Sequence, residues 1–162
     1  MNAEAVYDQL RARFPDKVSG TQGQGSLKCV QVKTEAIEEV LTALRDDWGF
    51  KHLSFISGID LKDAIEVAYG LISYAEKVMI LLKVRLDREN PTVRTVTHVF
   101  SGANWHERET YDLLGVRFEG HPDLRRLLLP DDWKGHPLRK DYKEEPSYHG
   151  MPTTRDPLLG RS

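Results

Sequence analysis

A chain of 162 residues, of which 40% are hydrophobic and 30% charged, has the size and balance of one globular domain with a single core. Its formal net charge is −2, with acidic and basic residues interleaved along most of the chain, which argues against nucleic acid or an anionic membrane as a direct partner. The single cysteine, Cys29, excludes an internal disulfide and any zinc or iron–sulfur site built from thiolates of this chain alone.

The N-terminus carries Glu4 and Asp8 and has no continuous apolar run, so we do not expect it to be a signal peptide. The longest apolar run, residues 78–82, has the length of a strand and falls far short of the ~20 residues that cross a membrane as a helix. We therefore expect a soluble, intracellular protein that reaches a membrane only through a partner.

Residues 3–14 predict a short amphipathic helix, which ends at Pro15. A flexible loop of Gly, Gln and Ser is expected over residues 19–26, because this run lacks the preceding strand and the Gly-Lys-Ser/Thr end of a phosphate-binding loop. Residues 27–32 predict a strand, in which Cys29 is expected to be a small buried side chain.

Thr34 is expected to cap the next helix, over about residues 35–47, whose apolar side chains fall in one stripe. Three strands follow, over residues 53–59, 65–71 and 78–86. The second and third are close enough for a hairpin, and the apolar start of the third suits a more central position. An antiparallel or mixed sheet with helices on one side predicts an α+β fold, a two-layer sandwich.

The segment 146–162 is rich in Pro and Gly and has few large apolar residues. Alone, it cannot bury enough surface to offset the entropy lost when it is ordered. We therefore expect one domain over residues 1–145, followed by an extended C-terminal tail that is either disordered or laid along a partner.

Residues 104–115 predict a clearly delimited helix. Asn104 is expected to cap its start, Glu107 to return a hydrogen bond to that cap, and Gly115 to end it in a left-handed conformation. Glu107 is expected on the side of Tyr111 and Leu114. The opposite face carries Trp105, Arg108, Glu109 and Asp112. This face is either solvated or used for docking, and the enrichment of Trp and Arg at interface hot spots supports docking.

The same helix contains residues that suggest catalysis. His106 and Glu107 resemble the start of the zinc-peptidase motif His-Glu-x-x-His, but Thr110 stands where the second histidine is required. Glu107 and Glu109 could be a pair of acid/base carboxylates, but residues two apart on a helix point to different sides. Capping by Glu107 and a salt bridge from Glu109 are simpler roles.

The loop that follows, up to residue 142, is too rich in large residues to be only a connector. It combines Arg125 and Arg126, beside three leucines, with Trp133 and Tyr142. Nucleic acid, a small molecule and a protein compete as its partner. Acidic residues in the same loop cancel the positive field that a nucleic-acid groove needs, so protein docking fits best.

Residues 103–116 resemble the signature helix of the C subunit family of respiratory complex I, the NADH:quinone oxidoreductase (the complex I 30 kDa subunit family). Residues 119–122, 124–130 and 131–133 continue the resemblance, and residues 137–142 complete it. The N-terminal two thirds of the chain are similar only in size and in the pattern of elements.

This resemblance implies a non-catalytic scaffold subunit of the peripheral arm of a proton-translocating enzyme. The chain would dock on the quinone-site subunit (the D subunit), near the B subunit with the terminal cluster and beside the adjacent cluster-bearing subunit, with its tail wrapped over a neighbour. No cofactor is expected in this chain, because FMN, the iron–sulfur clusters and quinone belong to other subunits. The implied location is the cytoplasmic face of the bacterial inner membrane. The residues carried over to interface or fold roles are Trp105, Glu107, Arg108, Glu109, Asp112, Arg125, Arg126, Trp133, Arg139, Lys140 and Tyr142.

Related complexes contain the same module, and the motif does not exclude them. They are membrane-bound hydrogenases, coenzyme F420 dehydrogenases and the photosynthetic NDH complex. From another class, the alternative is a stand-alone hydrolase that uses His106, Glu107, Glu109 or His121. An RNA-binding α+β domain is a third hypothesis, which predicts strongly salt-dependent binding to nucleic acid.

Overall fold

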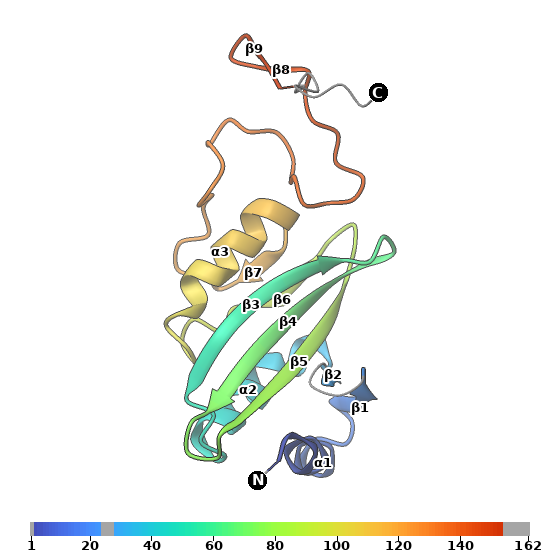
Figure 1. Cartoon of the computed structure of the whole chain (residues 1–162), viewed down its shortest axis with the longest axis vertical. Helices are drawn as coiled ribbons and strands as arrows, with labels where there is room; N and C mark the ends of the chain where they lie inside the picture. Colours follow the sequence, from blue (N-terminus) through green and yellow to red (C-terminus); the bar gives the residue numbers. More distant parts are fainter. Residues whose placement is uncertain (1, 24–27, 154–162) are drawn as a thin grey trace, which may run out of the picture.

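The computed structural model describes residues 2–23 and 28–153 (Figure 1). Its helices are α1 (Ala3–Arg13), the 3-10 helix η2 (Thr34–Ala36), α2 (Ile37–Asp46) and α3 (Ala103–Leu114). Its strands are β1 (Val18–Gln22), β2 (Cys29–Val32), β3 (His52–Asp60), β4 (Ala64–Ser73), β5 (Val78–Asp87), β6 (Thr92–Arg94), β7 (Arg117–Glu119), β8 (Ser147–Tyr148) and β9 (Met151–Pro152). The predicted α+β class is confirmed.

Five strands form one mixed sheet in the order β1-β2-β5-β4-β3. All neighbouring strands are antiparallel except β2 and β5, which run parallel. β4 and β5 pair from Ala64 opposite Asp87 to Ser73 opposite Val78, so the predicted hairpin is present. The apolar strand β5 is the middle strand of the sheet, as its composition predicts.

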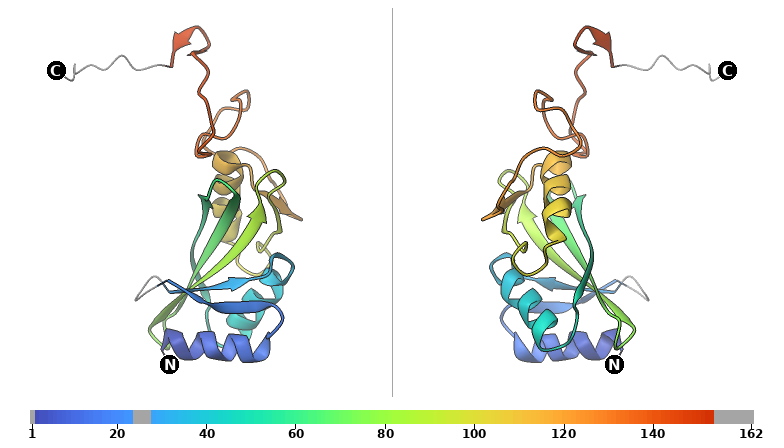
Figure 2. Two further views of the ribbon diagram at one scale, coloured as in Figure 1. Left: turned by 90° about the vertical axis from the view of Figure 1, so that its right-hand side faces the viewer. Right: turned by 90° about the vertical axis from the view of Figure 1, so that its left-hand side faces the viewer.

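The core face of the sheet is built by alternate residues of β4 and β5, because residues two apart on a strand share a face. These residues are Ile65, Val67, Tyr69 and Leu71 of β4, which lie opposite Leu86, Val84, Leu82 and Ile80 of β5. All eight are buried. α1, α2 and α3 bury side chains in the same hydrophobic cluster, so the sheet and the three helices share one core (Figure 2).

Helix α3 packs closely against the edge strand β3 at Gly58. A Cβ atom at this position would lie 2.3 Å from Leu114 Cδ1 and 3.0 Å from Thr110 Cγ2. Only glycine leaves room for the helix here. The position of α3 on the sheet therefore depends on the absence of a side chain at one residue of β3.

Two predictions for the N-terminal half were wrong. Strand β1 occupies most of the described part of the predicted loop 19–26, because Val18 pairs with Val32 and Thr21 with Val30 of β2, and this pairing outweighs the turn-like composition. Residues 24–26 of that loop lie outside the described residues. Thr34 does not cap α2: it begins η2, and its hydroxyl donates to the carbonyl oxygen of Arg85.

After β7 the chain continues as a C-terminal arm, residues 120–153. The arm first lies along α3 and then extends away from the body of the molecule to the short hairpin β8–β9 (Figures 1 and 2). The last nine residues of the predicted tail, 154–162, lie outside the described residues, and the boundary between residues 145 and 146 stays a prediction.

Candidate docking surface on helix α3 and the C-terminal arm

Helix α3 ends as predicted but does not begin as predicted. Gly115 follows its last residue in the left-handed conformation, with φ of 77°. At the start, the capping residue is Gly102 and no side chain forms a capping bond, so the roles predicted for Asn104 and Glu107 were wrong. Glu107 instead points into the protein, where its carboxylate accepts hydrogen bonds from Thr95 and Val96.

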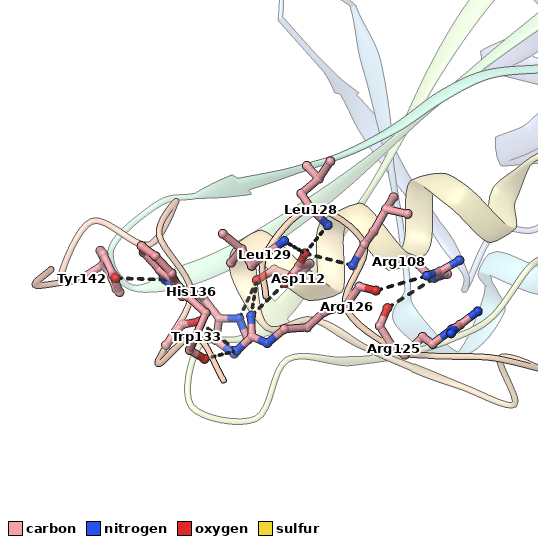
Figure 3. A network of polar contacts seen from close by, with 11 residues as sticks. Arg108, Asp112, Arg125, Arg126, Leu128, Leu129, Trp133, His136 and Tyr142 are labelled. Carbon is pink, nitrogen blue, oxygen red and sulfur yellow. Dashed lines mark hydrogen bonds and ion pairs between the residues drawn. The ribbon is translucent and has the colours of Figure 1, made fainter. Parts of the chain in front are cut away.

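Asp112 is the centre of the network that holds the arm on α3 (Figure 3). Its side chain is fully buried, and Oδ2 accepts the backbone N–H groups of Leu127, Leu128 and Leu129 at 3.0, 2.7 and 2.9 Å. Oδ1 accepts from Arg126 Nη1 at 2.8 Å. Burial alone would raise the pKa of Asp112, but these four donors hold it below its ordinary value.

Two arginines extend the network along the arm. Arg126 Nη2 donates to the carbonyl oxygens of Trp133 and Gly135, at 2.9 and 3.2 Å. Arg108 of α3 donates from Nε and Nη2 to the carbonyl oxygens of Arg125 and Arg126, at 3.2 and 3.1 Å. Since most of these bonds join a charged side chain to a backbone group, they fix the path of the arm itself.

The arm also completes the C-terminal end of α3. The last carbonyl groups of a helix have no partner inside the helix. Here the carbonyl oxygen of Asp112 lies 2.9 Å from His136 Nδ1, that of Leu113 accepts from the Leu138 amide at 3.0 Å, and that of Leu114 accepts from Arg139 Nε at 2.7 Å. The helix end and the arm therefore depend on each other.

A second attachment point joins the arm to the end of β3. The buried carboxylate of Asp60 pairs with Arg88 and accepts the backbone N–H of Lys140 at 2.8 Å and of Lys62 at 2.7 Å. Arg88 also binds Asp141, at 2.7 Å. The Arg88 guanidinium, with the two backbone donors, holds the pKa of Asp60 far below its usual range, although burial opposes this.

The outer part of the arm contains a small aromatic cluster. Trp133 Nε1 donates to the Tyr142 hydroxyl at 3.1 Å, and the Trp133 and Tyr148 rings lie 5.2 Å apart. The carboxylate of Asp132 lies 2.7 Å from both the Tyr148 hydroxyl and His149 Nε2. These contacts link the inner part of the arm to the β8–β9 hairpin.

The profile of the family described as "Respiratory-chain NADH dehydrogenase, 30 Kd subunit" matches residues 30–148, which include most of the sheet, α3 and nearly all of the arm. The chain belongs to this family. The predicted resemblance to the complex I 30 kDa subunit family is therefore confirmed.

Relatives of this 30 kDa subunit family match most of the chain. The C subunit of the NADH-quinone oxidoreductase of Roseiflexus sp. (strain RS-1) is 45% identical over 84% of this chain and 81% of the relative. The C subunit of the F(420)H(2) dehydrogenase of Methanosarcina mazei is 38% identical over 91% and 96% of the two chains. A solved structure titled as the trypsin-resistant fragment of Nqo5 has a TM-score of 0.65 and 30% identity, and covers 75% of this chain and 98% of that one. These relatives support a role as a subunit of a multi-subunit oxidoreductase complex.

The structure of this 30 kDa family member separates the predicted interface residues into two groups. Glu107 and Asp112 are fully buried in the chain, and Arg108 is 7% exposed. The side chains of these three residues bind backbone and side-chain groups of the chain itself, which is a fold role, and the predicted interface role of the set stays a prediction. The remaining predicted residues are exposed or half-buried, namely Trp105, Glu109, Arg125, Arg126, Trp133, Arg139, Lys140 and Tyr142.

The exposed side of α3 and the arm carries large apolar side chains. Trp105 is 60% exposed, Leu128 61% and Leu138 58%. The Arg108 guanidinium lies 5.2 Å from the centre of the Trp105 ring and so supports it from the helix side. The sequence analysis did not identify Leu128 and Leu138 as candidate interface residues. The only signal in the sequence was the presence of leucines in a loop of mixed charge.

The described residues, 2–23 and 28–153, hold neither a metal-ligand cluster nor a membrane-spanning helix. No group of His, Cys, Asp and Glu in this part of the chain is arranged to hold a metal ion. None of the helices found there is long and apolar enough to cross a membrane. Cys29 is buried, as expected, and burial raises the pKa of its thiol.

Proposed function

We propose that this chain is a non-catalytic scaffold subunit of the peripheral arm of a proton-translocating NADH:quinone oxidoreductase. It docks on the subunit that shapes the quinone site (the D subunit), beside the B subunit and the adjacent cluster-bearing subunit. FMN, the iron–sulfur clusters and quinone are held by those other subunits. The assembled complex keeps the chain at the cytoplasmic face of the bacterial inner membrane.

One observation carries this proposal: the buried charges around α3 are used to hold the arm in place. Asp112 binds three amides and one guanidinium, and Arg108 binds two carbonyl oxygens. These bonds fix the arm on α3, and the two together form a frame. The frame carries Trp105, Leu128 and Leu138 on its outer surface, where each side chain is more than half exposed. Large apolar side chains on a fixed frame are typical of protein interfaces, and tryptophan is the residue type most enriched at their hot spots.

The equivalent subunit of an F420H2 dehydrogenase is the second candidate. It is favoured by the Methanosarcina mazei relative, which is 38% identical over 96% of its own length. The two candidates differ in the electron donor of the whole complex and not in the role of this chain. The donor that reduces the purified native complex, NADH or reduced coenzyme F420, therefore distinguishes them.

Recovery of the tagged full chain from its native host tests the proposal. We expect it to be isolated with the cluster-bearing and quinone-site subunits of one complex, identified by mass spectrometry. Isolation of the chain only as a free monomer would contradict the scaffold role.

A double variant tests the surface itself. Replacing Trp105 and Leu128 by alanine removes two exposed side chains and keeps the backbone amide of residue 128 that Asp112 binds, and a loss of about 2 kcal/mol of binding free energy is expected from hot-spot behaviour. Recovery of the partner subunits should fall on the order of tenfold or more. The matched control is Tyr74→Ala, because Tyr74 is also an exposed aromatic residue (70%) but lies in the β4–β5 hairpin. Equal losses in both variants would refute the assignment of this surface.

A further inference from the structure

Glu107 lies in a buried polar cluster beneath α3. Its side chain is fully buried, Oε1 accepts from the Val96 amide at 2.8 Å, and Oε2 accepts from the Thr95 hydroxyl at 2.5 Å. Both donors are neutral. A buried carboxylate loses the hydration of its charged form, and neutral donors replace only part of that stabilisation. Its charged form is therefore disfavoured.

The nearest basic side chain does not supply the missing positive charge. His121 Nε2 lies 4.0 Å from Glu107 Oε2, and the side chain of His121 is also fully buried. His121 Nδ1 accepts the Asp123 amide at 3.0 Å, and Nε2 faces the Asn104 carbonyl oxygen at 3.3 Å. These two bonds require the neutral tautomer with its proton on Nε2. The ring therefore points its only N–H at a backbone carbonyl group.

The other titratable groups around Glu107 do not neutralise it either. The Tyr69 hydroxyl of β4 is buried and has no hydrogen-bond partner among the described residues. Burial raises the pKa of Tyr69, and the charge of Glu107 raises it further, which places the two groups in each other's field. On α3 itself, Arg108 is turned towards the arm and Glu109 is exposed. Within the described chain, no Lys or Arg forms an ion pair with Glu107.

We propose that Glu107 is a proton-dependent switch, which holds α3 against Thr95 and Val96 most firmly when it carries a proton and loosens this contact when the proton leaves. The protonated acid keeps an acceptor oxygen for the Val96 amide and removes the uncompensated charge. Every group in the cluster belongs to the interior of this chain, so the switch is independent of the proposed function.

The switch operates in the neutral range. Burial raises the pKa of Glu107 from 4.5 to about 7, although the bonds from Thr95 and Val96 act in the opposite direction. Because the folded-state pKa is raised, the stabilising effect is fully present below 4.5 and is lost as the pH rises through about 7. Between these values, one proton is linked to folding, so the folding equilibrium constant should fall on the order of tenfold per pH unit.

The test compares Glu107→Gln with Glu109→Gln in the full chain. The second variant makes the same chemical change two residues further on, at an exposed position of α3. Urea unfolding is measured for both and for the wild type at several values between about pH 5 and about pH 8. We expect the ratio of the folding equilibrium constant of E107Q to that of the wild type to rise by about tenfold per pH unit up to about pH 7. The folding equilibrium constant of E109Q should follow that of the wild type. Parallel curves for E107Q and wild type would overturn the proposal.

A second measurement does not depend on the folding of any variant. The side-chain carboxyl signal of Glu107 is followed by NMR in wild-type protein labelled at glutamate. A midpoint near pH 7 supports the switch, and a midpoint at or below about pH 5 overturns it. Exchange of the Val96 amide, corrected for its intrinsic pH dependence, should speed up above neutral pH. Exchange of the Leu128 amide, which is bound to Asp112, serves as the internal control.

Discussion

Removal of the Asp112 carboxylate should release the arm from α3 while leaving the sheet folded. In Asp112→Ala, the three amides of residues 127–129 and the guanidinium of Arg126 lose their acceptor at once. Each hydrogen bond to a charged group contributes about 1.5–3 kcal/mol, but such values do not add. The closer comparison is the loss of one partner from a buried ion pair, about 3–5 kcal/mol. The opening equilibrium of the arm should therefore shift on the order of a thousandfold.

Limited trypsin digestion and amide hydrogen exchange measure this opening. Arg125, Arg126 and Arg139 lie in the arm, and the last two bind carbonyl oxygens in the closed arrangement. Faster cleavage at these sites and faster exchange at Leu127–Leu129 are expected in Asp112→Ala, with slow exchange kept in β4 and β5. The cleavage and exchange rates of Asp112→Asn should fall between those of wild type and Asp112→Ala. Its amide oxygen can still accept hydrogen bonds, but its NH2 group faces the Arg126 guanidinium.

Asp123→Asn is the matched control for this experiment. It removes a carboxylate from the same arm, but Asp123 pairs with Arg125 in solvent, with side chains 50% and 71% exposed. Exposed pairs of this kind contribute little, so we expect near wild-type cleavage. If Asp112→Ala and Asp123→Asn open equally, the network around Asp112 does not hold the arm and the reasoning fails.

Two further predictions concern the support of α3 and the acid limit of the fold. Gly58→Ala should lower the free energy of unfolding by roughly 1–3 kcal/mol, because the new Cβ meets Leu114 Cδ1 at 2.3 Å; an unchanged thermal midpoint would show that the helix can move aside without cost. Arg88 lowers the pKa of Asp60, so this pair stabilises the fold above the ordinary aspartate pKa of ~3.9 and the effect is lost as the pH falls. Arg88→Met should therefore lose less stability than wild type between about pH 5 and about pH 3, measured by urea unfolding, and an equally steep loss in both would contradict this origin of the acid dependence.

The parts of the fold that could be predicted from the sequence are those set by neighbouring residues. The β4–β5 hairpin follows from two apolar strands with a short connection, and the end of α3 follows from Gly115, which adopts the left-handed conformation. Strand β1 could not be predicted in the same way. Its residues have turn-like composition, and only pairing with β2 makes them a strand.

The burial of Arg108 and Asp112 by the arm was missed for a related reason. In the sequence, Arg108 and Asp112 have the spacing and charge of a solvated helix face. Apart from the Arg126 guanidinium, their partners are backbone groups of the arm, 15 to 18 residues further along, and a backbone group carries no sequence signal. The Asp60–Arg88 pair spans 28 residues and is equally invisible. Burial of a charged residue by backbone hydrogen bonds can be recognised only when the path of the chain is known.

The two buried carboxylates of α3 give the helix opposite dependences on pH. Asp112 has a lowered pKa, so its bonds to the arm are present at neutral pH and are lost in acid. Glu107 has a raised pKa, so its contact with Thr95 and Val96 weakens as the pH rises through about 7. The difference comes from the donors: Asp112 receives three amides and a guanidinium, whereas Glu107 receives one amide and one hydroxyl. As the pH falls, the arm should therefore be released from α3 first. As the pH rises through about 7, the contact of α3 with Thr95 and Val96 should loosen first. The surface around Trp105 should be best ordered at a pH between these two transitions.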